Sequence, residues 1–232
     1  LPDGRIVAKT FATAFTGNPD AGVGLHRASG PVPVFGADGS LLDTLGVFPN
    51  YQSVVIDRGG GESMMDAPFP KHFYYDVQGG SILIGTADAI EVQIWEADDG
   101  LRSIFRTSNR DFENTQGDRE WYRARYLTAA ETAEDSVEIL TLLRALPFSE
   151  TRAAFTDLRF DAEGHIWLRT GRHLLYYAPS REWTVLSNDG YWLGTLTLPE
   201  NFDLHEVGSD YLLGTYRDEL GRTGIRMLEL QR

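Results

Sequence analysis

Three side chains that can bind ligands recur at every second position in the segment KHFYYDV, residues 71–77. His72, Tyr74 and Asp76 would share one face of a β-strand, because successive side chains of a strand point to opposite faces. If this strand is the innermost one of its sheet, the imidazole, phenol and carboxylate could bind a ligand or a metal ion. Polar strand faces are more often only solvated or hydrogen-bonded. The three residues are therefore ligand candidates, and no catalytic, cofactor-binding or metal-ligating residue is assigned.

The other chemically active residues form no recognisable constellation. His26, His173 and His205 are scattered, without the i, i+4 helical spacing of a zinc-binding helix, and His165 is expected to be a surface residue of a turn. The chain has no cysteine, which excludes disulfides, thiolate zinc sites and cysteine nucleophiles. The nucleophile motif Gly-x-Ser-x-Gly and the phosphate-binding loop Gly-x-x-x-x-Gly-Lys-Ser/Thr are also absent. No linear motif therefore assigns an enzymatic reaction.

Acidic turns raise the question of a calcium site. Calcium needs roughly six to eight oxygen ligands converging on one point, and the spacing of an EF-hand is absent. The acidic segments are better explained as hairpin turns: Asp38-Gly39, Asp98-Asp99-Gly100 and Asp189-Gly190. A calcium site built from side chains of several strands would leave no linear motif. Calcium therefore stays open as a cofactor, and no other cofactor is expected.

Composition limits the class of protein and of partner. The 232 residues are 42% hydrophobic, enough for one globular unit with a substantial core. The 34 acidic residues exceed the 21 basic ones, and the net charge of −13 opposes binding to nucleic acid or to an anionic membrane. No apolar run approaches the roughly 20 residues of a membrane-spanning helix, so no transmembrane segment is expected.

A repeated pattern of turns predicts the fold. The segment FTDLRFDAEGHIWLRTG (residues 155–171) reads as two strands joined by a two-residue turn at Glu163-Gly164, and EWTVLSNDGYWLGTLTLP (residues 182–199) as two more joined at Asp189-Gly190. Similar pairs of turns recur before this segment and after it. A four-stranded antiparallel meander needs neighbours of its own kind to cover both faces. The sequence therefore predicts an all-β fold, a β-propeller.

Helical periodicity interrupts the repeat between residues 118 and 146. DREWYRARYL (residues 118–127) and TAEDSVEILTLLRAL (residues 132–146) have helical spacing, with Asp118 and Thr132 as expected N-caps. A capping box from Thr132 to Asp135 is expected. The second helix should bury one stripe: Val137, Leu140, Leu143 and Leu146. We expect residues 118–146 to be a helical insertion between blades, and Thr10–Pro33 and Asn50–Pro70 to be long excursions from the first one.

The ends of the chain predict an incomplete ring. The chain opens on the first kind of turn, and RTGIRMLELQR (residues 222–232) reads as a third strand without a fourth. We expect about four blades, two of them incomplete, within a single domain (residues 1–232) truncated at its N-terminus, as part of a six-bladed ring. Tryptophans beside the turns are expected to pack between blades: Trp95, Trp167, Trp183 and Trp192.

The segments DAEGHIWLR, EWTVLSNDGYWLGTLTLP and SDYLLGTYRDELGRTGIRMLEL resemble the C-terminal blades of bacterial six-bladed β-propeller proteins grouped with NHL-repeat and TolB-like propellers. The resemblance is strongest from Asp161 onward. It implies a six-bladed ring and an extracytoplasmic location, periplasmic, secreted or lipid-anchored, with a signal upstream of Leu1. It implies no established activity.

Two functions remain open from the sequence. The first is a non-enzymatic six-bladed β-propeller that serves as a binding or scaffold module for a protein, peptide or glycan. The alternative is a calcium-dependent lactonase- or lyase-like enzyme with its site at the central channel. The first is favoured because no catalytic constellation can be read from the sequence.

Overall fold

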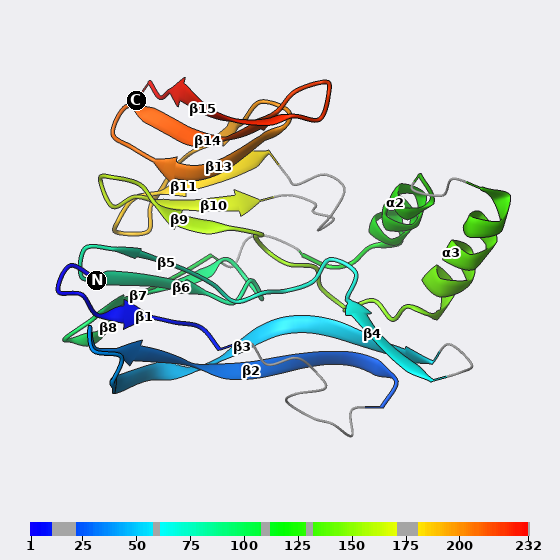
Figure 1. Cartoon of the computed structure of the whole chain (residues 1–232), viewed down its shortest axis with the longest axis horizontal. Coiled ribbons are helices and arrows are strands. Elements are labelled where there is room, and N and C mark those ends of the chain that lie inside the picture. Colours follow the sequence, from blue (N-terminus) through cyan, green and yellow to red (C-terminus); the bar gives the residue numbers. More distant parts are fainter. Residues whose placement is uncertain (11–21, 58–60, 108–111, 129–131, 171–180, 232) are drawn as a thin grey trace.

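The structure is a computed structural model that describes residues 1–10, 22–57, 61–107, 112–128, 132–170 and 181–231. Within the second helix, it does not describe the side chains of residues 133–135 and 138. The described chain consists of four antiparallel sheets and two helices, as Figure 1 shows. The predicted all-β fold is therefore confirmed at this level.

In each sheet, neighbouring strands follow one another along the chain, which makes every sheet an up-and-down meander. Sheet I contains β1 (Ile6–Val7), β2 (Gly24–Phe35), β3 (Leu41–Asp57) and β4 (Glu62–Asp66). Sheet II contains β5 (Tyr74–Gln78), β6 (Ser81–Gly85), β7 (Glu91–Glu96) and β8 (Gly100–Arg106). Sheet III contains β9 (Leu158–Phe160), β10 (Ile166–Thr170), β11 (Glu182–Leu186) and β12 (Trp192–Thr197). Sheet IV contains β13 (Phe202–Val207), β14 (Tyr211–Arg217) and β15 (Thr223–Glu229).

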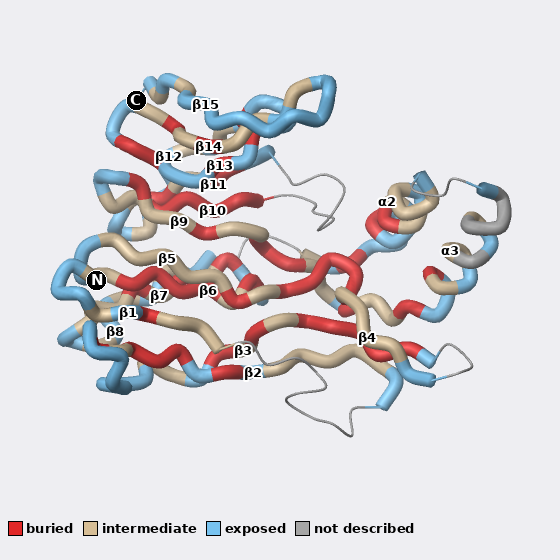
Figure 2. The backbone as a smooth tube through the Cα atoms, in the orientation of Figure 1, coloured by how far each residue is buried: buried red, intermediate tan, exposed pale blue. Residues whose placement is uncertain are grey.

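The sheets stack face to face in chain order, from sheet I at the bottom of Figure 1 to sheet IV at the top. Strand alternation explains how one sheet serves two cores. In β6, Leu83 packs into the core between sheets II and III, whereas Ile82 and Ile84 pack into the core between sheets I and II. Sheet II is therefore covered on both faces, which is why β6, Ser81–Gly85, is a nearly continuous apolar run. Figure 2 shows this buried centre of the stack.

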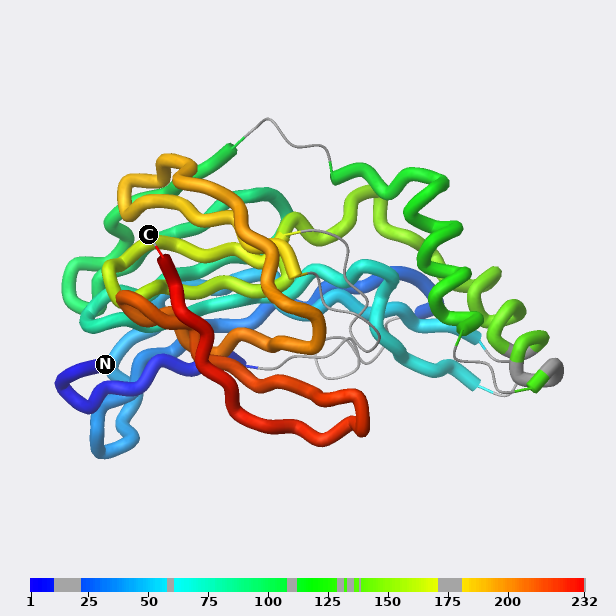
Figure 3. Tube along the Cα trace, turned by 90° about the horizontal axis from the view of Figure 1, so that it is seen from above, coloured from blue at the N-terminus to red at the C-terminus, as the bar shows by residue number. Residues whose placement is uncertain are grey.

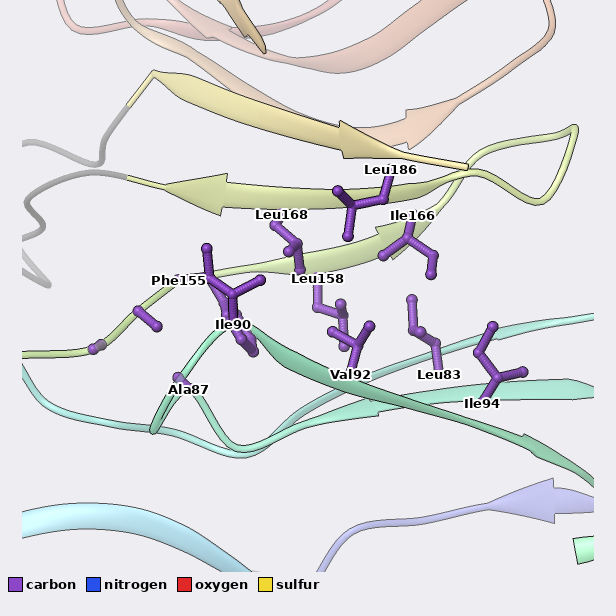
Figure 4. Close-up of a cluster of buried hydrophobic side chains, with 12 residues drawn as sticks. Leu83, Ala87, Ile90, Val92, Ile94, Phe155, Leu158, Ile166, Leu168 and Leu186 are labelled. Atoms are coloured by element: carbon purple, nitrogen blue, oxygen red, sulfur yellow. The ribbon is translucent and has the colours of Figure 1, made fainter. Parts of the chain in front are cut away.

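Sheet III repeats the arrangement one step along the stack. Ile166 and Leu168 of β10 face sheet II, in the cluster drawn in Figure 4, and Trp167 between them faces sheet IV. Trp167 and Trp183 are both buried, and Trp95 is partly buried against the core between sheets I and II. The predicted packing role is thus confirmed for these three. It is wrong for Trp192, whose exposed fraction is 64%, because β12 is the outermost strand of its sheet.

The hairpin turns in sheet III are longer than predicted. At residues 161–165, the amide of Gly164 donates to the carbonyl of Asp161 (3.0 Å), and the amide of Asp161 donates to the carbonyl of His165 (3.0 Å). Gly164 has φ +84°, while Glu163 is not among the described residues with positive φ. A two-residue type I′ turn would need positive φ at both central residues, so this is a three-residue hairpin loop that ends on a glycine bulge. The turn at Asp189-Gly190 has the same form.

The sequence predicts two incomplete sheets, but sheet I has four strands. In the part of the chain that the structure describes, only sheet IV has three strands. Sheet I has four because the excursion at Asn50–Pro70 contains β4, which pairs with the far end of β3. The described part of Thr10–Pro33 includes most of β2, so this part of the excursion belongs to a strand of a long ribbon. The far end of this ribbon lies beneath the two helices, on the right in Figure 3.

The helices are α2 (Gln116–Leu127) and α3 (Ala133–Ala145), close to the predicted insertion at residues 118–146. The N-cap of α2 is Thr115 rather than Asp118. The hydroxyl of Thr115 accepts from the amide of Asp118 (3.2 Å), and the carboxylate of Asp118 accepts from the amide of Thr115 (3.1 Å). Asp118 takes part in capping, but as the third residue of the helix in a capping box and not as the predicted N-cap. The predicted box at Asp135 lies outside the described side chains.

The apolar stripe of α3 follows a true helical period. Val137, predicted to be buried, is 66% exposed, whereas Leu143 and Leu146 are buried as predicted. The stripe continues through Ile139 and Leu142, because a spacing of three residues drifts around a helix of 3.6 residues per turn. Both helices pack in one cluster with β3 and the segment after β4, α3 through this stripe and α2 through Tyr122. Among the described helices, none has the length and apolarity needed to cross a membrane.

Candidate functional site

The first strands of three consecutive sheets, β5, β9 and β13, lie next to one another and are joined by hydrogen bonds. An Oδ atom of Asp76 in β5 accepts from the amide of Phe160 in β9 (2.7 Å), and Gln78 donates to the carbonyl of Asp161. Arg159 in β9 donates through Nη1 to the carbonyl of His205 in β13 (2.8 Å). These contacts satisfy backbone groups of strands that are edges of their own sheets.

A polar groove of about 270 Å³ runs along these strands. We call it the first-strand groove. Its lining includes ionisable or hydrogen-bonding side chains from all three sheets: Asp76, Gln78, Arg159, Asp161, His205, Glu206 and Tyr211. Residues far apart in the sequence therefore meet here because the sheets stack in register.

Negative charge exceeds positive charge in the groove. Asp76 and Glu206 contribute carboxylates and Arg159 contributes a guanidinium group, whereas Asp161 has a carboxylate side chain that is only 1% exposed. Glu206 accepts a hydrogen bond from the phenol of Tyr211, and this bond raises the pKa of Tyr211 above its usual value. The guanidinium of Arg159 also pairs with Asp157 (3.1 Å), and the carboxylate of Asp157 partly offsets its positive charge. The lining is suited to hydrogen-bond a polar ligand that carries positive charge.

Asp161 is the most constrained of these carboxylates. One oxygen accepts from the amides of Glu163 and His165 (both 2.9 Å), and the other from the indole of Trp167 (3.1 Å) and the His165 ring, whose Nδ1 lies at 2.9 Å. Burial would raise the pKa of Asp161, but the hydrogen bonds from His165 and Trp167 outweigh burial, and the pKa lies below its ordinary value.

The Asp161–His165 pair resembles a catalytic dyad, in which a carboxylate orients an imidazole. His165 borders a second cavity, of about 540 Å³, near the end of sheet IV. The same pairing recurs in the turn at residues 218–222, where Nε of Arg222 lies 2.7 Å from Asp218. A recurrence with arginine, which does not act as a base, indicates that the pair braces the turn.

Of the three residues predicted from the sequence, His72 and Tyr74 lie together, with their ring centroids 5.9 Å apart, while only Asp76 lines the first-strand groove. Asp76 lines the first-strand groove, while Tyr74 turns to the core between sheets II and III and packs against Phe155 (5.7 Å between ring centroids). Burial raises the pKa of Tyr74 above its usual range. His72 lies before β5 rather than within it, with its ring centroid 5.0 Å from that of Tyr51. His173 lies outside the described residues.

Sequence reasoning did not single out Arg159 or Glu206 and treated His205 as isolated. A signal was present, because Asp76, Arg159 and His205 each precede a hairpin turn of the first kind by two or three residues. Aligning the repeats at their turns places these three side chains near the same end of the first strands of their sheets. Among the described residues, no group of three or more His, Asp and Glu residues could hold a metal ion.

Comparisons with known proteins give no family. No family model and no curated protein matches the chain. A luciferin-regenerating enzyme is 10% identical with a TM-score of 0.32, and the match covers 88% of this chain and 58% of that protein, less than two thirds of its length. Hsv2 of Kluyveromyces lactis is 8% identical with a TM-score of 0.30, over 96% of this chain and 72% of Hsv2. A Bacteroides caccae protein of unknown function is 11% identical with a TM-score of 0.31, over 85% and 68%. Similarities this distant assign no activity.

Proposed function

We propose that this chain is a non-enzymatic binding or scaffold module built as an arc of a β-propeller, and that it binds a protein, peptide or glycan. Support comes from four meander sheets that stack in chain order with the first strands of three of them adjacent, as around the axis of a propeller. Membership of the bacterial six-bladed NHL-repeat and TolB-like group, and an extracytoplasmic location, are parts of the same proposal.

The observation that carries the proposal is the first-strand groove, where polar side chains of three consecutive sheets line one cavity. The carboxylates of Asp76 and Glu206 against one guanidinium favour a cationic ligand group, and the net charge of −13 would attract it from a distance. Of the proposed partner classes, a protein or peptide carrying lysine or arginine fits this groove best. Rigid strands hold the lining side chains, which suits binding without rearrangement.

A labelled octapeptide of alternating glycine and arginine tests the groove by fluorescence anisotropy. Glu206→Gln keeps a hydrogen-bond acceptor for Tyr211 but removes the charge, and we expect it to weaken binding several-fold. Glu62→Gln is the matched control, since Glu62 is exposed at the start of β4 and does not line the groove. Equal loss in both variants would show a general electrostatic attraction and would contradict the proposal.

The alternative function is a calcium-dependent enzyme with its site at the central channel. Among the described residues, no group of three or more His, Asp and Glu residues could hold the calcium ion. Thermal unfolding with and without calcium provides an independent check, because a ligand that binds the native state raises the unfolding midpoint. We expect the midpoint to stay unchanged up to millimolar calcium. A rise at micromolar calcium would contradict the proposed non-enzymatic role.

A further inference from the structure

Two consecutive aromatic side chains stand exposed at the outer edge of sheet III. Tyr191 is 73% exposed and Trp192, at the start of β12, is 64% exposed. Exposed aromatic rings side by side are costly to hydrate and commonly mark a binding surface. Unlike the two buried tryptophans earlier in sheet III, these two residues do not lie in the core.

The two residues border a groove of about 470 Å³ between the outer strands of sheets II and III, a size within the range of small-ligand sites. Residues from β8 and from the β11–β12 hairpin contribute to its lining: Phe105, Arg106, Thr107, Thr184, Leu186, Gly190, Tyr191 and Trp192. Its walls therefore come from two neighbouring sheets.

Gly190 fixes the position of the aromatic pair against β8. Its backbone has φ +83°, and a Cβ at this position would overlap the ring of Phe105. The turn can approach β8 this closely because glycine has no side chain. Tyr191 and Trp192 follow directly, so their distance from β8 is set by this contact.

Among the described residues that line the groove, Arg106 has the one charged side chain, and its carboxylate partner lies outside the lining. Arg106 pairs through Nε with Glu91 (2.6 Å), and the side chain of Arg106 is 65% exposed. The two opposite charges offset one another, and this favours a neutral ligand. At the groove the guanidinium of Arg106 can donate, and the phenol of Tyr191 and the hydroxyl of Thr107 can both donate and accept.

We propose that this groove binds a neutral oligosaccharide, with a sugar ring stacked on Trp192 and its hydroxyls hydrogen-bonded near Arg106 and Tyr191. The polarised C–H groups of a sugar face suit the negative face of an aromatic ring. Sugar hydroxyls both donate and accept, as the hydroxyls of Tyr191 and Thr107 do, whereas a proline-rich peptide offers carbonyl acceptors without backbone donors. The site is separate from the first-strand groove and does not depend on it.

Isothermal titration calorimetry with cellohexaose, maltohexaose and chitohexaose tests the proposal, with decaproline as the peptide probe. We expect at least one oligosaccharide to bind, and Trp192→Ala to weaken that binding about tenfold or more. Trp192→Phe should restore part of the affinity because it keeps an aromatic face. Leu193→Ala is the matched control: Leu193 is the next residue, is 52% exposed and does not line this groove.

Three outcomes would overturn the glycan site. They are no heat with any of the three oligosaccharides at about 5 mM, unchanged affinity in Trp192→Ala, and binding of decaproline in place of the sugars. Glu206→Gln separates this proposal from the first, since it alters the first-strand groove alone. Sugar binding that survives in Glu206→Gln but fails in Trp192→Ala supports the rim site whatever the fate of the first-strand groove.

Discussion

Two turns of sheet III share a backbone and differ in what they do. In the Asp161 turn (residues 161–165) and the Ser187 turn (residues 187–191), the first side chain accepts from the amides of the third and fifth residues. A glycine with φ +84° or +83° follows at the fourth position of each. In the first turn the fifth side chain, His165, folds back onto the carboxylate, and in the second it is the exposed Tyr191.

The repeated sequence determines the backbone conformation of the turn. The position of the following strand in its sheet determines whether the side chains at the end of the turn are buried or exposed. Ile166 and Trp192 each follow the fifth residue of their turn, yet Ile166 is fully buried and Trp192 is exposed. The strand after the Asp161 turn, β10, has a neighbour on each side, and the strand after the Ser187 turn, β12, is an edge. The same turn therefore has a structural role before an inner strand and a surface role before an edge strand.

Truncating the two tryptophans should give the largest contrast. Trp167→Ala removes a buried side chain from the core between sheets III and IV, and we expect a loss of about 3–5 kcal/mol in the free energy of unfolding. Trp192→Ala should change it by less than about 0.5 kcal/mol, since the side chain is mostly exposed. Urea denaturation measures both. Similar losses in the two variants would break the comparison.

Replacing the carboxylate of the Asp161 turn should have the next largest effect. Asp161→Asn keeps the shape but leaves hydrogen-bond donors around the amide without matched acceptors, which should cost about 1–3 kcal/mol. Because the folded-state pKa of Asp161 is lowered, the carboxylate stabilises the fold above the ordinary value of 3.8 and loses this contribution as the pH falls through the folded-state value. Asp161→Asn should therefore lose less stability than the parent protein between about pH 4 and pH 2. A parallel pH dependence of the two urea midpoints would contradict the role of this carboxylate.

The predictable and unpredictable parts of the molecule follow the same division. The apolar runs of β6 and β10 and the turns that precede them are visible in the local sequence, so the meanders and the burial of Trp167 could be predicted. The first-strand groove combines Asp76, Arg159 and Glu206 from three sheets, and no linear motif connects them. The exposure of Trp192 depends on the position of β12 as the outermost of the described strands in its sheet, and local periodicity carries no information about neighbouring strands.

The glycines of the two turns separate backbone strain from packing. Gly164→Ala should cost about 1–2 kcal/mol, because L-residues disfavour this left-handed conformation and the nearest group, Oε1 of Gln78, is 3.7 Å from an added Cβ. Gly190→Ala carries the same strain and also forces the turn away from Phe105. We expect it to cost about 1 kcal/mol more than Gly164→Ala in urea denaturation. Equal costs would mean that Phe105 yields freely and does not position the rim aromatics.

The fifth residues of the turns should give the smallest and most direct contrast. His165→Ala removes the ring that pairs with Asp161, and we expect a loss of about 1 kcal/mol, moderated by partial exposure of the ring. Tyr191→Ala removes a ring that is 73% exposed and should stay within about 0.5 kcal/mol of the parent protein in the same urea denaturation experiment. Tyr191→Ala should instead weaken oligosaccharide binding, whereas His165→Ala should leave it unchanged. If Tyr191→Ala destabilised the fold as much as His165→Ala, both turns would brace the sheet in the same way, and the exposed ring would no longer mark a separate surface function.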